Sequence, residues 1–282
     1  MGANHARVLA DLDGVELVAV ADADQSRCAK ATAGRPTPAF ADAATLLREA
    51  APQMVSVVVP TQLHEEVALA VIASGAHLLV EKPLAANVSS AHTIAAAAAV
   101  AGVILTVGHI RDVGVIHDLA PHDIDIMRFL LGQEVETVYG DARRHITTEF
   151  EDLFTGMLRF SGGAMGVLEI NWLTPTKRRE LEVLCERGMF VVDYAAQSLS
   201  FYENYAATAR EGAIASVTEG PMTRYPIPSR EPLRVELEAF RDAILHGGPP
   251  PVDATAGIAA LSVVEAFVRS AEIGAPVTLD SL

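Results

Sequence analysis

The stretch HLLVEKPLA at residues 77–85 decides the fold class, because an apolar run without helical period leads directly into charged residues and a proline. Such a run at residues 77–80 predicts a buried strand of a parallel sheet. Two similar runs lie on either side of it along the chain, MVSVVVP at residues 54–60 and VILTV at residues 103–107. Because helical patterns separate these runs, the sequence predicts a parallel α/β sheet with right-handed crossovers.

The first fifty residues continue this alternation. ELVAVAD at residues 16–22 is a further short apolar run that predicts a buried strand. Residues 4–12, 25–32 and 42–50 have the spacing of short helices. Residues 1–110 are therefore predicted to form one α/β domain.

The pattern changes after residue 108. One helix is predicted over residues 117–131, and the runs beyond it alternate apolar and polar residues, which is typical of antiparallel strands. Residues 111–282 are therefore predicted to form an α+β domain with a large, mainly antiparallel sheet. Its expected strands are residues 153–160, 164–172, 180–185, 189–194 and 199–202, and its two closing helices are marked by Leu233, Leu237, Phe240 and Ile244 and by Ile258, Leu261, Val264 and Val268.

Composition and charge exclude several classes of function. The chain has 282 residues, of which 50% are hydrophobic, so it can bury a substantial core. A formal net charge of −15 opposes attraction to nucleic acids and to anionic membranes, and we expect neither as a partner. The most apolar run, residues 93–107, is shorter than the roughly 20 residues of a membrane-spanning helix. With only Cys28 and Cys185 available, no disulfide framework is expected, and a cytoplasmic protein is predicted.

Asp22 is a candidate ligand of a dinucleotide. It ends the predicted strand over residues 16–22, about 20 residues after Gly2. An acid at this point of a βαβ unit accepts hydrogen bonds from ribose hydroxyls, and it repels a 2′-phosphate, which favours NAD over NADP. A turn aspartate that caps the next helix is an equally open interpretation.

Lys82 lies at the end of the central predicted strand, within Glu81-Lys82-Pro83. The carboxyl ends of strands are where open α/β sheets build their ligand crevice. A lysine at this place can donate to a substrate hydroxyl, although most lysines are solvated surface groups.

Asp118 and His122 are four residues apart on the predicted helix 117–131, so their side chains share one face. A histidine can take the proton of a hydroxyl while hydride leaves the same carbon, and a carboxylate beside it can orient the ring. A helix cap or a surface contact is the alternative. No metal site is expected, because the sequence has neither an HExxH nor a CxxC motif.

Taken in order, these motifs resemble those of the glucose–fructose oxidoreductase / inositol dehydrogenase family, called Gfo/Idh/MocA. Later segments look similar to members described as UDP-N-acetylglucosamine 3-dehydrogenases or inositol dehydrogenases. The residues that carry the family resemblance are MGANH at 1–5, ELVAVAD at 16–22, VVPTQLH at 58–64, VEKPLA at 80–85 and HDLAPHDID at 117–125; those of the narrower likeness are 171–183, 190–194 and 198–204.

The resemblance implies an N-terminal Rossmann domain and a C-terminal domain whose sheet forms a homodimer or homotetramer. It also implies NAD-dependent hydride transfer at a ring hydroxyl carbon of a sugar, cyclitol or nucleotide sugar. It further implies that Lys82, Asp118 and His122 are catalytic, with His122 as the acid/base. The cofactor ligands that it implies are Gly2, Asp22, Thr61, His64, Glu81 and Lys82.

Two departures from the family pattern are expected to matter. The family's G-x-G-x-M-G loop follows a first strand, and here Gly2 matches only its third glycine. Loss of that central strand would remove about five buried apolar side chains and about 10 kcal/mol, comparable to a domain's whole stability of about 5–15 kcal/mol. A start codon assigned too far downstream or a genuine truncation would explain it. The second departure lies between Ile110 and Arg111, where relatives carry a further helix and strand.

Two rival functions therefore stay open beside the oxidoreductase. One is a catalytically impaired or truncated family member that acts as a binding module. The other is a reductase of imines or enals, similar to the biliverdin-reductase-like members of this fold, which would not need His122.

Overall fold

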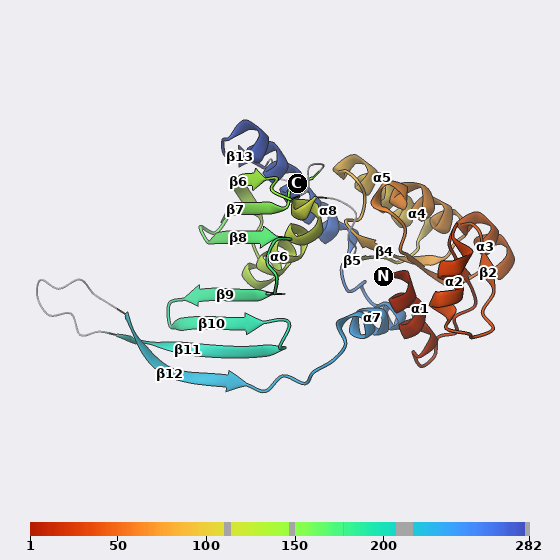
Figure 1. Cartoon of the computed structure of the whole chain (residues 1–282), viewed down its shortest axis with the longest axis horizontal. Coiled ribbons are helices and arrows are strands. Elements are labelled where there is room, and N and C mark those ends of the chain that lie inside the picture. The colour runs from red at the N-terminus through yellow and green to blue at the C-terminus, as the bar shows by residue number, and fades with distance from the viewer. Residues whose placement is uncertain (110–113, 147–149, 177, 207–216, 280–282) are drawn as a thin grey trace, which may run out of the picture. The chain divides into compact units, whose positions relative to one another are not determined.

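A computed structural model describes residues 1–109, 114–146, 150–176, 178–206 and 217–279 (Figure 1). The chain divides into two compact units, one made of Met1–Leu173 with Pro232–Leu282 and the other of Thr174–Glu231. The predicted domain boundary between residues 110 and 111, and the departure at the same point, lie outside the described residues. The division into residues 1–110 and 111–282 stays a prediction.

The N-terminal half of the first unit alternates helices and short parallel strands, as the sequence predicts. Asp24, Asp42 and Asn87 begin three of the helices, and each side chain accepts a hydrogen bond from a backbone N–H of the first turn. The elements are α1 (Gly2–Ala10), β1 (Val20–Ala21), α2 (Gln25–Thr32), β2 (Ala39–Phe40), α3 (Ala43–Ala50), β3 (Met54–Val57), the 3-10 helix η1 (Thr61–Leu63), α4 (His64–Ala73), β4 (His77–Lys82), α5 (Val88–Ala101) and β5 (Leu105–His109).

The parallel sheet is present in two pieces, which corrects the strand expected over residues 16–22. In the first piece β3, β4 and β5 pair in parallel, with Val80 opposite both Val57 and Val107. β1 covers only two residues and pairs with β2 in a separate two-stranded sheet. Among the described residues no strand joins β1 to β3, so residues 16–19 lack the second ladder partner that a buried parallel strand needs.

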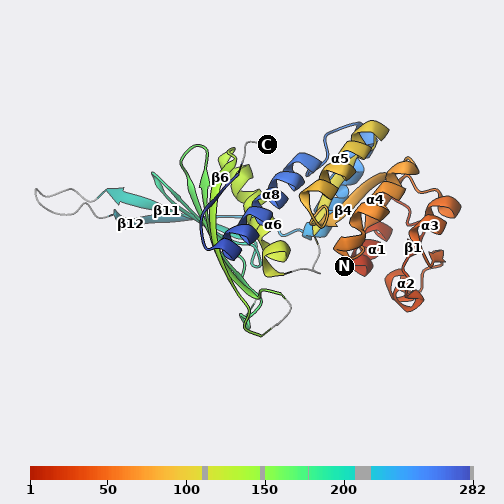
Figure 2. The same cartoon turned by 90° about the horizontal axis from the view of Figure 1, so that it is seen from above.

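The remainder of the first unit is an antiparallel sheet with two long helices on it. The strand order is β13-β6-β7-β8, and α6 and α8 lie on one face of this sheet (Figure 2). β6 and β13 were not expected from the sequence. The elements are α6 (Val115–Leu131), β6 (Val135–Arg143), β7 (Leu153–Phe160), β8 (Met165–Asn171), α7 (Pro232–His246), α8 (Ala254–Ile273) and β13 (Val277–Thr278).

Alternation along β4 divides the core into two parts. Leu78 and Val80 pack in a cluster with residues of α4, α5 and α8, whereas Leu79 packs on the opposite side against residues of α1 and α7. α1 itself lies beside α2 and α7 (Figure 1). Consecutive side chains at the end of β4 therefore meet different helices.

α8 is the one described helix with the length and apolar composition of a membrane span. Half of its residues are fully buried in the structure, from Gly257 to Ser270. Its hydrophobicity is therefore accounted for by packing against α5, α6 and β6.

The second unit is a four-stranded antiparallel meander in the order β12-β11-β10-β9. Its first hairpin lies where the sequence predicts it, and Phe190 contacts Phe201 across two strands with ring centroids 4.5 Å apart. The strands are β9 (Glu180–Cys185), β10 (Gly188–Asp193), β11 (Ser198–Ala206) and β12 (Val217–Tyr225).

Two phenylalanines join α8 to the antiparallel sheet of the first unit. Phe154 of β7 and Phe267 of α8 are completely buried and meet edge to face, with ring centroids 5.0 Å apart. Gly156 makes room for this pair, because an added Cβ there would lie 2.7 Å from the Phe267 ring. A glycine at position 156 is therefore required for the close packing of the two rings.

Replacement of Phe267 by alanine should lower the free energy of unfolding by about 3–5 kcal/mol, since it leaves a cavity under the sheet. Urea denaturation followed by circular dichroism measures the loss. Phe129→Ala is the matched control, because Phe129 is 85% exposed and its removal should change stability by about 0.5 kcal/mol or less. Equal losses in the two variants would contradict this packing.

Candidate active site

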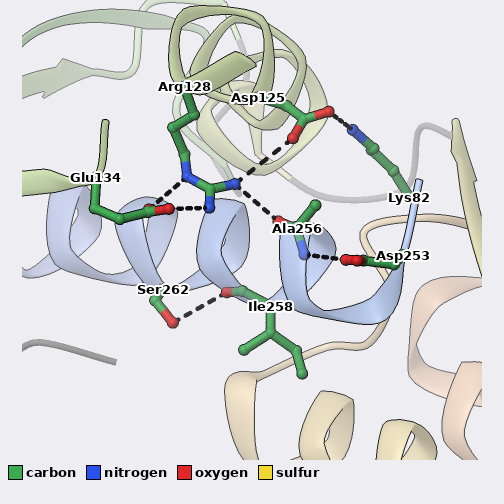
Figure 3. A network of polar contacts seen from close by, with 8 residues as sticks. All are labelled: Lys82, Asp125, Arg128, Glu134, Asp253, Ala256, Ile258 and Ser262. Atoms are coloured by element: carbon green, nitrogen blue, oxygen red, sulfur yellow. Dashed lines mark hydrogen bonds and ion pairs between the residues drawn. The ribbon is translucent and has the colours of Figure 1, made fainter. Parts of the chain in front are cut away.

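Lys82 lies at the carboxyl end of β4 and is buried, with 4% of its surface exposed. Its Nζ atom lies 3.6 Å from Oδ2 of Asp125 on α6 (Figure 3). Beside Lys82 is a small cavity lined mainly by apolar atoms, including those of Leu84, Val107 and Pro121. The structure therefore places a charged amine at the edge of an apolar hollow, at the end of a parallel strand where the sequence predicts a ligand crevice.

Arg128 holds Asp125 from the other side (Figure 3). Its Nη1 lies 3.7 Å from Asp125 Oδ1, and its Nε and Nη2 each donate to Glu134 at 2.7 Å. The same guanidinium reaches the backbone oxygen of Ala256 on α8 at 3.5 Å, beside the Asp253 cap that begins that helix. The bidentate contact with Glu134 fixes the plane of the guanidinium, so Asp125 is oriented toward Lys82.

Asp118, His122 and Asp125 occupy positions i, i+4 and i+7 of α6, so they share one face of the helix. The contact between Asp125 and Lys82 turns this face toward the end of β4. The start of α6 is anchored by Glu151, whose Oε1 accepts a hydrogen bond from Ile116 N at 3.2 Å. The predicted pair of Asp118 and His122 is thus on the same side of the helix as the partner of Lys82.

Trp172 positions Asp118. Its Nε1 donates to Asp118 Oδ2 at 2.9 Å, and Asp118 is only 5% exposed. His122 is half-buried one turn further along the helix. The two side chains differ in exposure, since the Asp118 carboxylate is covered by an indole, whereas the His122 ring is partly exposed, with its Nδ1 atom buried.

Glu81 faces the other side of β4 from Lys82. His5 Nε2 lies 2.5 Å from Glu81 Oε1, and His5 Nδ1 lies 2.7 Å from the hydroxyl of Ser56. Both Glu81 and His5 are buried. This row of Ser56, His5 and Glu81 links β3 and α1 to the strand end that carries Lys82.

Burial dominates the electrostatics of the strand end. Desolvation lowers the pKa of Lys82, and the carboxylate of Asp125 opposes this effect by favouring the ammonium form. Desolvation also raises the pKa of Glu81, against the hydrogen bond from His5. Burial therefore favours the uncharged form of both neighbouring groups, the Glu81 carboxyl and the Lys82 amine. Such shifted pKa values are common at functional sites.

The predicted cofactor ligands lie at the ends of other elements of the N-terminal half. Gly2 begins α1, whose first turn contains no acidic residue, as suits an anion at a helix N-terminus. Asp22 follows β1; its Oδ1 accepts a hydrogen bond from Asp24 N at 2.8 Å and its Oδ2 lies 4.0 Å from Arg27 Nη1. The cap of α2 is Asp24 and not Asp22, so the capping interpretation of Asp22 is wrong.

Thr61 and His64 lie on the segment that follows β3. The His64 ring bridges the backbone oxygens of Val59 and Pro83 at 3.0 and 2.9 Å, so it ties this segment to the turn after Lys82. Thr61 is buried, and its Oγ1 has no hydrogen-bond partner among the described residues. Glu81 Oε2 is likewise buried without a partner there, so the residues present leave polar atoms that fit the hydroxyl groups of a dinucleotide.

Sequence reasoning missed four contributors to this site: His5, Asp125, Arg128 and Trp172. The spacing of Asp125, seven residues after Asp118 on one helix, was a usable signal. The contact of Trp172 with Asp118 spans 54 residues, so no local spacing in the sequence marks it. No cluster of three or more metal-ligating side chains occurs in the part of the chain that the structure describes.

Both halves of the chain match models of one protein family. Residues 1–109 match the model described as "Oxidoreductase family, NAD-binding Rossmann fold", and residues 108–191 match the "GFO/IDH/MocA C-terminal domain". The chain is 26% identical over 309 residues to UDP-N-acetylglucosamine 3-dehydrogenase of Acidithiobacillus ferrooxidans, covering 95% of this chain and 96% of that protein. It is 28% identical over 322 residues to inositol 2-dehydrogenase 1 of Saccharopolyspora erythraea, covering 99% and 94%.

Solved structures share the fold. A crystal structure of the Acidithiobacillus ferrooxidans UDP-N-acetylglucosamine 3-dehydrogenase superposes with a TM-score of 0.84 at 23% identity, covering 96% of this chain and 94% of that one. The WlbA dehydrogenase of Bordetella pertussis, in complex with NADH and UDP-GlcNAcA, superposes with a TM-score of 0.78 at 21% identity, covering 99% and 95%.

Replacement of Asp125 by asparagine should lower the free energy of unfolding at neutral pH by about 2–4 kcal/mol, because it leaves the Lys82 ammonium buried without its partner. Asp141→Asn is the matched control, since the pair of Asp141 with Arg143 is exposed and contributes about 0–1 kcal/mol. Denaturant titration of both variants makes the comparison. A loss for Asp125→Asn no greater than that of the control would show that the pair does not stabilise the strand end.

Proposed function

Because the chain belongs to the Gfo/Idh/MocA oxidoreductase family, we propose that it transfers hydride between NAD and a ring hydroxyl carbon of a sugar, cyclitol or nucleotide sugar. The membership confirms the predicted family, the α/β fold class and the oxidoreductase class. The single observation that carries the proposal is the contact of Lys82 with Asp125, on the helix face that also holds Asp118 and His122.

Three side chains carry the proposed chemistry. In the oxidation direction His122 accepts the proton of the reacting hydroxyl, and in reduction it returns that proton. Lys82, as an ammonium, donates a hydrogen bond to the same oxygen and so stabilises negative charge that develops on it. Asp118, held by Trp172, orients the substrate or the imidazole. Bound NAD would supply the hydride acceptor.

The proposal assigns cofactor binding and substrate binding to different domains. Residues 1–110 bind the dinucleotide, with Gly2, Asp22, Thr61 and Glu81 as ligands beside Lys82 and with His64 holding the loop. The carboxylate of Asp22 favours NAD over NADP because it repels a 2′-phosphate. Residues 111–282 bind the substrate and carry the interface between subunits. The names of the relatives, a nucleotide-sugar dehydrogenase and an inositol dehydrogenase, support a substrate with several ring hydroxyls.

Association into a homodimer or homotetramer is proposed through the sheet of the first unit. Tyr139, Met157 and Val167 lie directly opposite one another on β6, β7 and β8. All three are exposed, by 41%, 46% and 62%. A row of apolar side chains across three strands is the kind of surface that a second subunit covers. We also propose a cytoplasmic location, which the free thiols of Cys28 and Cys185 support.

Replacement of Lys82 by alanine should lower kcat/KM at least about 100-fold, because the reacting oxygen loses its hydrogen-bond donor. Binding of NADH should persist, seen as saturable enhancement of its fluorescence. The assay uses the full chain with NAD and a panel of sugars, inositols and UDP-sugars. Lys30→Ala is the matched control, since Lys30 lies exposed on α2 and should keep full turnover.

Three results would redirect the proposal. Undiminished turnover of the Lys82 variant would remove the assigned role of that lysine. Absence of saturable NADH enhancement with the unaltered chain would favour the binding module. Full turnover of His122→Ala would favour the imine or enal reductase.

Replacement of Met157 by glutamate should convert the assembly to monomers, because it puts a charge in the middle of the apolar row. Sedimentation equilibrium of the purified protein measures the mass. Val100→Glu is the control, since Val100 is 91% exposed on α5 and should leave the mass unchanged. A Met157 variant with the mass of the unaltered assembly would rule out this face as the interface.

A further inference from the structure

Glu236 on α7 is a half-buried carboxyl that has no hydrogen-bond or ion-pair partner among the described residues. It lies beside Glu81: a Cβ added to Gly108 on β5 would be 3.4 Å from Glu236 Oε1 and 3.4 Å from Glu81 Cδ. Two carboxyl groups therefore lie near one another at the end of β4. Such a pair is unfavourable unless a cation or a proton balances it.

Packing holds Glu236 in this place. The next residue, Leu237, and Phe240 one turn on are completely buried in the cluster with Leu79 of β4. Arg241 also joins α7 to the turn after α1, because its Nη1 donates to Asp13 O at 2.9 Å. The position of the carboxyl thus follows from the helix and does not depend on a flexible chain end.

The charged groups at this strand end shift one another's pKa values. The pKa of Glu236 is raised to about 7, because desolvation and the neighbouring Glu81 carboxyl together raise it more than Lys82 lowers it. In return, Glu236 and Asp125 raise the pKa of Lys82 against its burial. Glu236 is therefore charged above neutral pH, where its charge supports the ammonium, and is neutral below it.

The other charged groups around this set come from two further helices. His5 on α1 contacts Glu81 at 2.5 Å. Asp125 and Arg128 on α6 lie on the side of Lys82, and Arg128 disfavours the ammonium. Arg128 is held by Glu134, and among the described residues Glu236 has no neutralising contact of its own.

We propose that Glu236 is a positioning residue that keeps the Lys82 amine charged, acting with Glu81 across the end of β4. The inference rests on the proposed function, in which Lys82 donates a hydrogen bond to the reacting oxygen. Loss of the carboxyl would leave the amine free to lose its proton at lower pH. Turnover would then fail at the alkaline end of its range.

The lysine content of the chain makes a direct test practical. The sequence contains only Lys30, Lys82 and Lys177, so protein labelled with ¹³C-lysine gives three side-chain Cε signals. Lys82→Arg assigns the signal of interest by its loss. Titration of that signal reports the protonation of the amine without any turnover.

In Glu236→Gln the Lys82 signal should titrate about 1 pH unit lower than in the unaltered protein, because an anionic neighbour is gone. Glu236→Asp should restore part of the shift. Glu238→Gln is the matched control on the same helix, since Glu238 contacts Arg234 at 3.4 Å, and it should leave the titration unchanged. In the unaltered protein, the signal should also show a small inflection near pH 7 as Glu236 ionises, a measurement that needs no variant to fold.

The pH dependence of kcat/KM is measured for the same variants. The alkaline limb of kcat/KM should move down by the same shift in Glu236→Gln and stay in place in Glu238→Gln. If no substrate is turned over, the proposed function fails, while the lysine titration still decides whether Glu236 controls the amine. An unmoved Lys82 titration in Glu236→Gln would overturn the control of the amine by Glu236. A moved titration with an unmoved alkaline limb would show that the charge of Lys82 does not limit turnover, and would overturn Glu236 as a positioning residue.

Discussion

The ion pair between Lys82 and Asp125 is the interaction on which the candidate site depends. An ammonium that is 4% exposed would lose its proton or disrupt its surroundings without a carboxylate beside it. Asp125 supplies that carboxylate. Arg128, itself paired with Glu134, orients the Asp125 side chain toward Lys82. The end of β4 and the middle of α6 are joined by charge rather than by apolar packing alone. For this reason Asp118 and His122, on the same helix face, share the neighbourhood of Lys82.

The alternation of a strand explains how two adjacent residues serve different purposes. Glu81 belongs to the face of β4 that meets α1 and α7, where it contacts His5 and neighbours Glu236. Lys82 belongs to the face that meets α6 and borders the small cavity. Both groups are desolvated, so the charge of each is felt by the other through a medium of low polarity. Through Glu81 and Lys82, the protonation of Glu236 on α7 is therefore coupled to the charge of Asp125 on α6.

Much of this architecture could be predicted from the sequence, because its determinants are local. Asp42 and Asn87 are typical residues at the start of a helix. The spacing of Asp118 and His122 places both side chains on one face of α6. The division of the parallel sheet could not be predicted in this way. A run such as residues 16–22 has strand propensity, yet becomes a strand only where a neighbour completes the hydrogen-bond ladder, and that neighbour is a property of the whole fold.

The residues that tune the site could not be predicted, because their contacts are made between positions far apart along the chain. His5 contacts a residue 76 positions away, and Trp172 one 54 positions away. Glu236 reaches Glu81 only because α7 returns to pack beside α1. No period or spacing marks such residues, because each lies on an otherwise ordinary amphipathic or β-rich segment. The charge of Lys82 is consequently set by groups on two separate helices, Asp125 and Arg128 on α6 and Glu236 on α7. Any change that loosens α7 from α1 should therefore alter the chemistry of the strand end before it alters the fold.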